Sequence, residues 1–530
     1  MLSFNRLNVA RLAGNTVSLF LLSVVSLAFW GLLSSSDTVF WKNSFDPYLL
    51  SVLRFSLWQA FVSAIASLGI GLLMARSLAM LSSQFNSWLL SLCLRAWGLC
   101  FVAPVILVVL AVVSSLGSSS SIQQMLPIEW NLYGLNGIVI AHCFLNAPLV
   151  ARQTYLLYQG IPSRYWQQAE QLNFSSWQRW RIIEWPQLRG SIFSLLCLVF
   201  LLCFGSFTVV LALGGGPQTS TLEVAIYQAL RYDFDLVFAA QCALVQLAIS
   251  LLIGGFLLGR EKVVALQPSI SRFSLNLSPW QKLRHRLILS SGNVFLLLIA
   301  SGAFSSIHEL NWSNLPWDKL AQSALWSVSI AMLSLVWVLC MGLSLLWRHY
   351  NLLQQQRGLG RFQELLASIL LLCPSMVITT GIYCLLLPIA DIESYTLLIV
   401  SLVNALIALP FFIRSLKQTL HQIHLDYSKL LQSLDITSIA VLRWVIWPRM
   451  RHAFSLACAL VLVLSIGDMG VIALIGSTQI VTLPLLLYQQ LSSYQFALAS
   501  LTGLVLLLLC GLLFWICEAL IVGKSHDPKT

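Results

Sequence analysis

The chain has 530 residues, of which 58% are hydrophobic and only 9% are charged. A soluble protein needs more charge to keep its surface hydrated, so the composition excludes a soluble globular fold and indicates a membrane protein. The formal net charge of +11 does not indicate nucleic-acid binding, because the basic residues stand between apolar runs, where they orient a membrane protein. The 12 cysteines form no CxxC pair, so no metal or cofactor site is expected.

Apolar runs of helical length occur in two sets along the chain. The first six lie near residues 12–33, 50–75, 89–113, 137–157, 191–213 and 238–258. The second six lie near residues 287–306, 321–347, 365–387, 397–416, 453–475 and 496–520. Such long, uniformly apolar runs are helices rather than barrel strands, so we expect an all-α integral membrane protein with about 12 transmembrane helices. No cleavage site follows the first run, so we expect it to be retained as a helix.

The distribution of basic residues predicts the orientation of these spans. With both termini in the cytoplasm, 25 of the 30 Lys and Arg residues fall in cytoplasmic segments. Four fall in outer segments, and Arg95 lies inside a span. Because positive residues are retained on the cytoplasmic side, this division favours a multi-pass protein with both termini inside.

Part of the second half repeats the first at an offset of 262 residues, which holds from Pro148 to Gly214 and continues after a one-residue slip at Thr221. Matches include Arg, Trp and Pro in a polar loop, which argues against chance alignment of apolar segments. Six spans per half place both copies in the same orientation, related by a pseudo-twofold axis along the membrane normal. We therefore expect a first transmembrane domain at residues 1–258, a cytoplasmic linker at 259–286 and a second domain at 287–530.

Each half carries the repeated loop on its cytoplasmic side, at about residues 158–190 and 417–452. Both copies show a short helical pattern, a polar break, a second short helix and then Trp-Pro at the start of the next span. A Pro is suited to that position because the first turn of a helix does not use its missing N–H.

This pattern resembles the "EAA" loop of binding-protein-dependent ABC importer permeases, in which a Pro stands about fourteen residues after a Leu. The resemblance implies a type I importer fold and a coupling helix that docks on an ATPase subunit. The residues that match its positions are Gln168, Ala169, Leu172, Asn173 and Pro186 in the first copy, and Leu431, Leu434, Asp435 and Pro448 in the second.

The two copies depart from the family pattern. Neither keeps the acid of the Glu-Ala-Ala triplet, and Asn173 and Asp435 replace the Gly. Asn and Asp are the residues that best tolerate the left-handed conformation after Gly, so a left-handed turn is expected there. The alternative is an ordinary basic amphipathic loop that lies on anionic lipid.

The chain shows no ATP-binding motif of its own. Gly523, Lys524 and Ser525 end a Walker-like string, but Glu518 stands where its first Gly should be. The family resemblance implies that two copies of a separate ATPase subunit hydrolyse ATP. This chain is then a non-catalytic translocation subunit that binds no cofactor.

Longer strings are similar to the permeases of thiamine and thiamine phosphate ABC importers of Gram-negative bacteria. They are LGGGPQ at 213–218, TLEVAIYQAL at 221–230, YDFD at 232–235, RFSLWQAF at 54–61 and EWP at 184–186. The resemblance implies a thiamine permease in the inner membrane that works with a periplasmic thiamine-binding protein. Ferric-iron importer permeases, which share the fused layout, are the nearest alternative, and an ion-coupled secondary transporter is a further one.

Three residues are candidates for the substrate path. Asp468 is an acid inside a span, where acids usually face a cavity or a partner, although it could instead cap a helix break between Gly467 and Gly470. Glu223 and Tyr227 are expected near the outer mouth, where solvation or contact with the binding protein is the alternative role.

Overall fold

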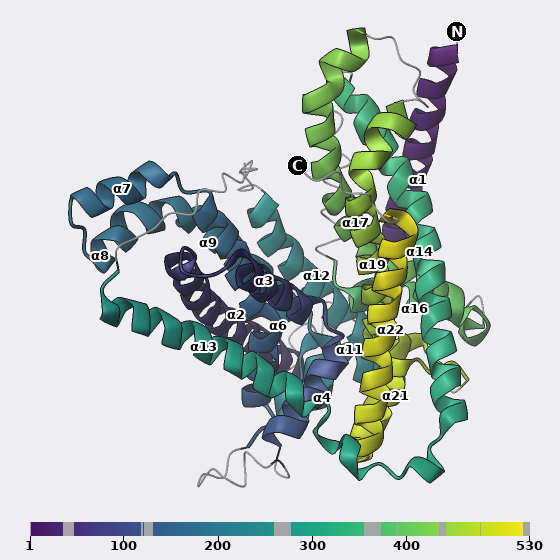
Figure 1. Cartoon of the computed structure of the whole chain (residues 1–530). Helices are drawn as coiled ribbons and strands as arrows, with labels where there is room; N and C mark the ends of the chain where they lie inside the picture. Colours follow the sequence, from purple (N-terminus) through teal and green to yellow (C-terminus); the bar gives the residue numbers. More distant parts are fainter. Residues whose placement is uncertain are drawn as a thin grey trace.

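The computed structural model describes residues 2–34, 47–117, 120, 131–258, 277–354, 373–388, 391–433, 441–477 and 479–522, and every regular element within these ranges is helical. Ten of the described helices are long and apolar enough to cross a membrane (Figure 1). They are α1 (Leu2–Ser34), α2 (Pro47–Leu81), α6 (Leu135–Gln159), α9 (Trp185–Phe204), α12 (Leu236–Leu258), α13 (Pro279–Gly302), α14 (Trp317–Gln354), α17 (Ile392–Ser433), α19 (Trp447–Gly467) and α22 (Phe496–Val522).

The remaining two predicted spans are not single straight helices in the described part. The run at 89–113 forms α3 (Ser87–Val102) and α4 (Val105–Leu116), which are bent by 101°. Pro104 explains the bend, since it has no N–H to continue α3 and it forces Ala103 into an extended conformation with ψ 137°. Of the run at 365–387, the structure describes α16 (Ser375–Leu386), which follows Pro374 in the same way.

The internal repeat is visible in the folded chain. Both α4 and α16 are helices of 12 residues that begin directly after a Pro. A matched hydrogen bond also occurs in each half: Ser56 Oγ accepts the N–H of Leu222 at 2.9 Å, and Ser327 Oγ accepts the N–H of Leu483 at 2.8 Å. These bonds fix the start of α11 (Leu222–Gln228) on α2 and of α21 (Leu483–Ser492) on α14. The halves therefore share their internal construction.

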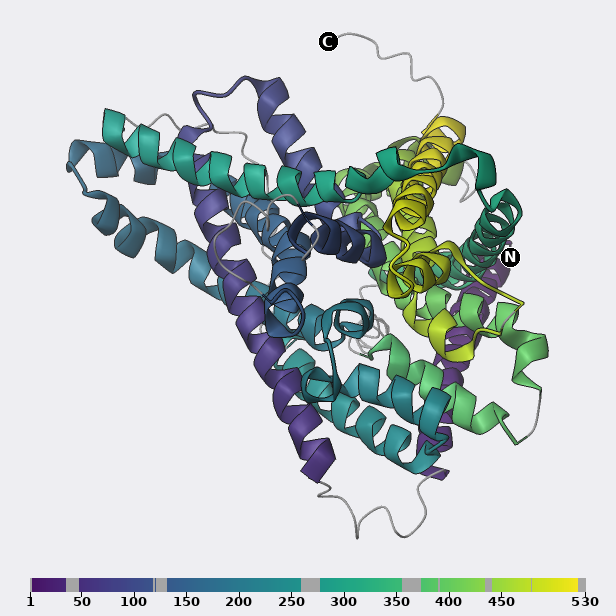
Figure 2. The ribbon, with the colours of Figure 1, turned by 90° about the horizontal axis from the view of Figure 1, so that it is seen from below.

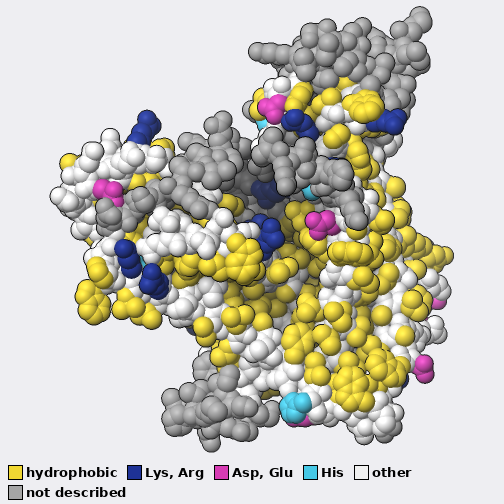
Figure 3. Space-filling model, viewed as in Figure 1, with side chains coloured by type: hydrophobic (Ala, Val, Ile, Leu, Met, Phe, Trp, Pro, Cys, Tyr) yellow, Lys and Arg dark blue, Asp and Glu magenta, His cyan; other side chains and the backbone are white. Residues whose placement is uncertain are grey.

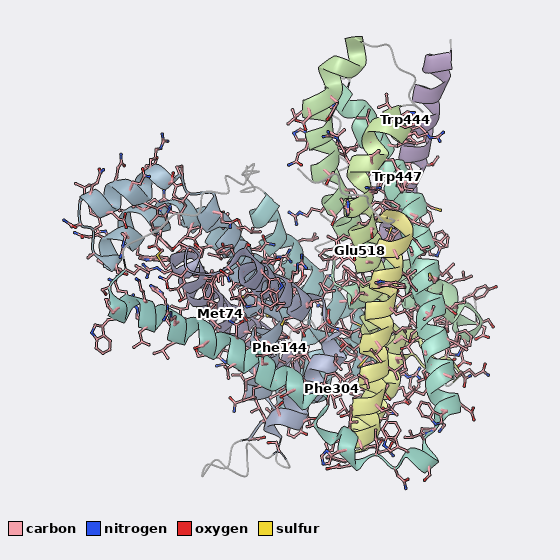
Figure 4. The ribbon with its side chains drawn as sticks, in the orientation of Figure 1. Met74, Phe144, Phe304, Trp444, Trp447 and Glu518 are labelled. Atoms are coloured by element: carbon pink, nitrogen blue, oxygen red, sulfur yellow. The ribbon has the colours of Figure 1, made fainter. Side chains whose placement is uncertain are left out.

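The first helix of each half packs on the other half. Figure 2 shows α1 among the helices of the second half, where it contacts α14 and α16, while α13 lies along α2 and α4. Close backbone approach makes this possible, because a Cβ on Gly31 of α1 would lie 2.3 Å from the carbonyl oxygen of Gly381 in α16. On the other side, Gly292 of α13 lies against Met74 of α2 (Figure 4).

The outer surface is the apolar surface expected of a protein in lipid. Large apolar side chains are exposed along the outer helices, among them Trp30, Leu297, Leu325 and Trp515, and Figure 3 shows this apolar cover over much of one face. At the end of the molecule that carries α7 and the C-terminal end of α17, the two halves diverge, and the surface between them is hollowed (Figures 1 and 3).

Candidate functional site

The first coupling loop begins with the short helix α7 (Ser163–Gln171), which ends in a left-handed turn. Asn173 has φ 50°, as predicted for the residue that replaces the family's Gly. The N–H of Phe174 donates to the carbonyl of Ala169 at 2.9 Å, and the N–H of Asn173 donates to that of Glu170 at 3.0 Å. This pair of bonds is the Schellman motif, which satisfies the last carbonyls of a helix.

A second short helix, α8 (Ser176–Arg179), follows the turn, and the capping box of Ser175 and Gln178 fixes its start. Leu172, which lies between the two helices, is 66% exposed. Trp177 of α8 is also exposed. Gln168 is exposed as well, whereas Ala169 is buried and holds α7 to the protein. Exposed apolar side chains at a helix-turn-helix are suited to insertion into a groove on another protein.

A buried ion pair joins this loop to α2. Nε of Arg76 donates to Oε2 of Glu184 at 2.8 Å, and Nη2 donates to Oε1 at 2.9 Å. The hydroxyl of Tyr158 also donates to Glu184 at 2.7 Å, and the Arg76 guanidinium binds the carbonyl of Ser176 and lies 5.4 Å from the Trp180 ring centroid. We call these five residues the Arg76 anchor. It fixes the loop on the C-terminal part of α2.

Both loops pass into the next membrane helix through a π-helical turn. These turns are η1 (Trp180–Glu184) and η6 (Leu442–Ile446), which lie at equivalent positions of the repeat. Pro186 and Pro448 are the second residues of α9 and α19, as expected. The residues before each Pro are already helical, because the π-helical turn leads directly into the membrane helix. The wider turn accommodates the Pro, which removes a hydrogen bond and crowds the preceding turn of a regular helix.

The second coupling loop is constructed differently. Residues Leu434 and Asp435 lie outside the described residues, and Leu431 lies in α17, which continues without a break from Ile392 to Ser433. In the first half, by contrast, α6 stops at Gln159 and the N-cap Pro162 begins α7. The second half has Gln422 and His424 where the first has Gly160 and Pro162, so nothing interrupts its helix.

The second loop does not keep the acid and the tyrosine of the Arg76 anchor. Ile446 and Leu420, both buried, occupy the positions of Glu184 and Tyr158. Instead, the guanidinium of Arg449 lies 4.3 Å from the ring centroid of Tyr427, which joins α19 to the end of α17 by a cation–π contact. Figure 4 places Trp444 and Trp447 at this end of the second half, and both side chains are exposed.

Helix breaks from both halves meet in the interior. In the first half, Gly205 and Ser206 separate α9 from α10 (Phe207–Leu213), and in the second half Asp468 and Met469 separate α19 from α20 (Gly470–Ile475). A Cβ on Gly467 would lie 3.4 Å from Cα of Pro104, and one on Gly470 would lie 3.6 Å from Cδ1 of Phe207. The break of the second half therefore packs directly on the first half.

The structure brings the three predicted path residues to this region. Asp468 Oδ2 accepts the N–H of Val471 at 3.2 Å, so it caps α20 as the alternative role proposed. Glu223 lies beside the other break, where a Cβ on Gly205 would be 3.6 Å from its Oε1. Glu223 is buried, not solvated as the alternative had it. The ring of Tyr227 contacts that of Phe207, with centroids 5.4 Å apart.

Several residues of these sites were not found from sequence. Arg76 and Glu184 are 108 positions apart, so no local pattern joins them. The available signal was a difference between the repeats, because Glu184 is matched by Ile446 in an otherwise similar string. Gln246 donates from Nε2 to Glu223 at 2.9 Å. Nothing in the apolar run around Gln246 indicates this contact.

Comparison with known proteins gives the class first. Residues 67–259, which include the first coupling loop and the first helix break, match the family of binding-protein-dependent transport system inner membrane components. The fold, the repeated loop and this match define a multi-pass permease subunit of a transport system in the inner membrane.

Relatives that match nearly the whole chain give the closer family. The chain is 36% identical to the thiamine transport system permease protein of Escherichia coli over 507 residues, covering 93% of each. It is also 36% identical to the proteins of that name from Salmonella typhimurium, over 94% of this chain and 95% of the relative, and from Haemophilus influenzae, over 93% and 94%. The chain belongs to this family of permeases.

Proposed function

We propose that this chain is the transmembrane subunit of an ABC importer that moves thiamine, and its phosphate esters, from the periplasm to the cytoplasm. The observation that carries the proposal is the alignment at 36% identity over 93% of the chain with permeases of thiamine transport systems. The matched length includes both halves, so it covers both coupling loops and both interior breaks.

Transport is driven by two copies of a separate ATPase subunit, one docked on each coupling loop, and this chain itself binds no ATP or other cofactor. The exposed Leu172 and Trp177 support a docking surface in the first half, and the exposed Trp444 and Trp447 support one in the second. The proposed docking region of the first half also includes Gln168 and Asn173. That of the second half also includes Leu431, Leu434 and Asp435. Pro186 and Pro448 set the direction in which the following helices leave them.

A periplasmic thiamine-binding protein delivers the substrate to the opposite end of the molecule, and both termini lie in the cytoplasm. The orientation rests on the 25 of 30 basic residues that this arrangement places inside. ATP binding draws the loops together and opens the path outward, and hydrolysis resets it.

The test is uptake of labelled thiamine into proteoliposomes that contain this chain, the ATPase subunit and the binding protein. We expect uptake that requires ATP and that stops when the binding protein is omitted. Uptake driven by an ion gradient without ATP would contradict the ABC mechanism. ATP-dependent uptake of ferric iron in place of thiamine would retain the mechanism and overturn the substrate.

A further inference from the structure

Two interior acids come from opposite halves of the protein. Glu223 belongs to α11 of the first half and Asp468 to the break between α19 and α20 of the second. Their elements meet at Phe207, which lies against Gly470 and whose ring contacts Tyr227, one helical turn after Glu223. The repeat does not pair them, because Pro484 matches Glu223 and Ser206 matches Asp468. Each half therefore supplies one acid, from a different position, to the same interface.

The two acids have few compensating partners among the described residues. Glu223 is 1% exposed, its Oε1 accepts a hydrogen bond from Gln246, and its Oε2 has no hydrogen-bond partner. Asp468 Oδ2 accepts the backbone N–H of Val471 at 3.2 Å. Within the described part of the chain, neither carboxylate forms an ion pair. Acids in a membrane interior are costly, and they commonly mark a path for ions or substrates.

Aromatic rings of the first half lie beside these acids. The Phe207 and Tyr227 rings are 5.4 Å apart in an edge-to-face arrangement, and the Tyr227 and Tyr232 rings are 5.8 Å apart. Aromatic faces attract cations, and desolvation strengthens that attraction.

We propose that Glu223 and Asp468, together with Phe207 and Tyr227, form a binding site for an aromatic organic cation at the interface between the halves. The inference rests on the proposed function, since thiamine is a cation with two aromatic rings. Because each half holds one acid, a movement of the halves apart separates the two carboxylates and weakens the site.

The test uses variants that remove charge and keep shape. In the proteoliposomes described above, Glu223→Gln and Asp468→Asn should each lower the maximal rate of thiamine uptake by about 10-fold or more, the effect of losing a charge-assisted contact. Asn also caps helices, so Asp468→Asn preserves the start of α20. The matched control is Asp233→Asn, which neutralises an exposed acid near the same mouth and should leave uptake within about twofold of the original rate.

Stability and direct binding separate this role from a structural one. Both neutral variants should melt at the same temperature as the original protein or higher, because each loses an unpaired buried charge. Thiamine alone should raise the melting temperature of the purified permease–ATPase complex, and this shift should disappear in the double variant. The exchange Glu223→Asp with Asp468→Glu, which keeps both charges, should recover part of the uptake.

Three results would overturn the site: undiminished uptake in the neutral variants, an undiminished thiamine shift in the double variant, or a lower melting temperature of the neutral variants. Absence of thiamine uptake by the original protein would instead refute the proposed function, so the two failures are distinguishable.

Discussion

The two coupling loops lie at equivalent positions of the repeat, yet the chain supports them by different means. In the first half, Gly160 and Pro162 separate α7 from the membrane helix, and the Arg76 anchor fixes the loop on α2. In the second half, α17 continues from the membrane as one helix to Ser433, and Arg449 on Tyr427 holds its end. The first loop is thus held on α2, whereas the second continues directly from α17, so the two loops have different mechanical connections to the membrane helices.

The largest effect is expected from breaking the Arg76 anchor. Arg76→Met leaves Glu184, which is fully buried, without its cation, and removal of one partner from a buried pair costs about 3–5 kcal/mol. The melting temperature and thiamine uptake should both fall. The double variant Arg76→Met with Glu184→Gln should be more stable than the single one, and the exposed Arg181→Met serves as control. A melting temperature unchanged by Arg76→Met would show that the anchor does not support the loop.

Joining α6 to α7 should make the first loop resemble the second. Gly160→Gln with Pro162→His introduces the residues of α17, removes both helix breakers and redirects the docking side chains. We expect the affinity for the ATPase subunit to fall by about 100-fold, since the central contacts of an interface carry most of its energy. Binding to the permease in nanodiscs measures this.

The matched control for that change lies in the second half. Gln422→Ala with His424→Ala retains good helix formers in α17 and should preserve ATPase binding. If the joined first loop bound the ATPase as tightly as the original does, the separation of α7 would have no role in docking.

An intermediate effect is expected at the exposed Leu172. Leu172→Ala removes an apolar side chain from the proposed docking surface and should weaken ATPase binding about 10-fold. ATP hydrolysis by the partner should persist while uptake falls. Gln171→Ala, an exposed neighbour, should change neither quantity. The same substitution at Leu434 compares the two loops directly. Equal losses of ATPase binding and of uptake would mean that the two loops contribute equally to coupling.

The smallest effect is expected at the left-handed turn. Asn173→Ala should lower the free energy of unfolding by about 1–2 kcal/mol, the cost of a left-handed conformation for a residue with an ordinary Cβ. Asn173→Gly should be close to neutral, because Gly adopts this conformation freely. Thermal unfolding of both variants provides the measurement. The same pair of changes at Asp435 asks whether the second loop contains the same turn.

The sequence predicted the features that depend on local chemistry. The length of the apolar runs predicted the membrane spans, and the repeat predicted two similar halves. The tolerance of Asn for left-handed backbone predicted the turn at Asn173. These features require only neighbouring residues or a comparison of one half with the other. The domain boundaries at 258 and 287 remain a prediction, although α13 begins at Pro279, inside the predicted linker.

The features that depend on contacts between distant segments were not predicted. The sharp bend at Pro104 was concealed in a continuous apolar run, and the burial of Glu223 follows from packing against α12 rather than from its neighbours in sequence. The π-helical turns were also missed, because Pro186 and Pro448 are equally consistent with a helix start. In each case the deciding interaction joins residues that no sequence period relates.

The exchange of α1 and α13 between the halves has a consequence for biosynthesis. Gly31 finds its final partner at Gly381, 350 residues later in the chain. At about 5–20 residues per second, α1 is in the membrane for roughly 20–70 seconds before α16 has been made. During that interval its small-residue face is covered by lipid or by the insertion machinery. If the two halves were made as separate chains, each would complete its fold only by packing the first helix of the other: α1 on α14 and α16, and α13 on α2 and α4.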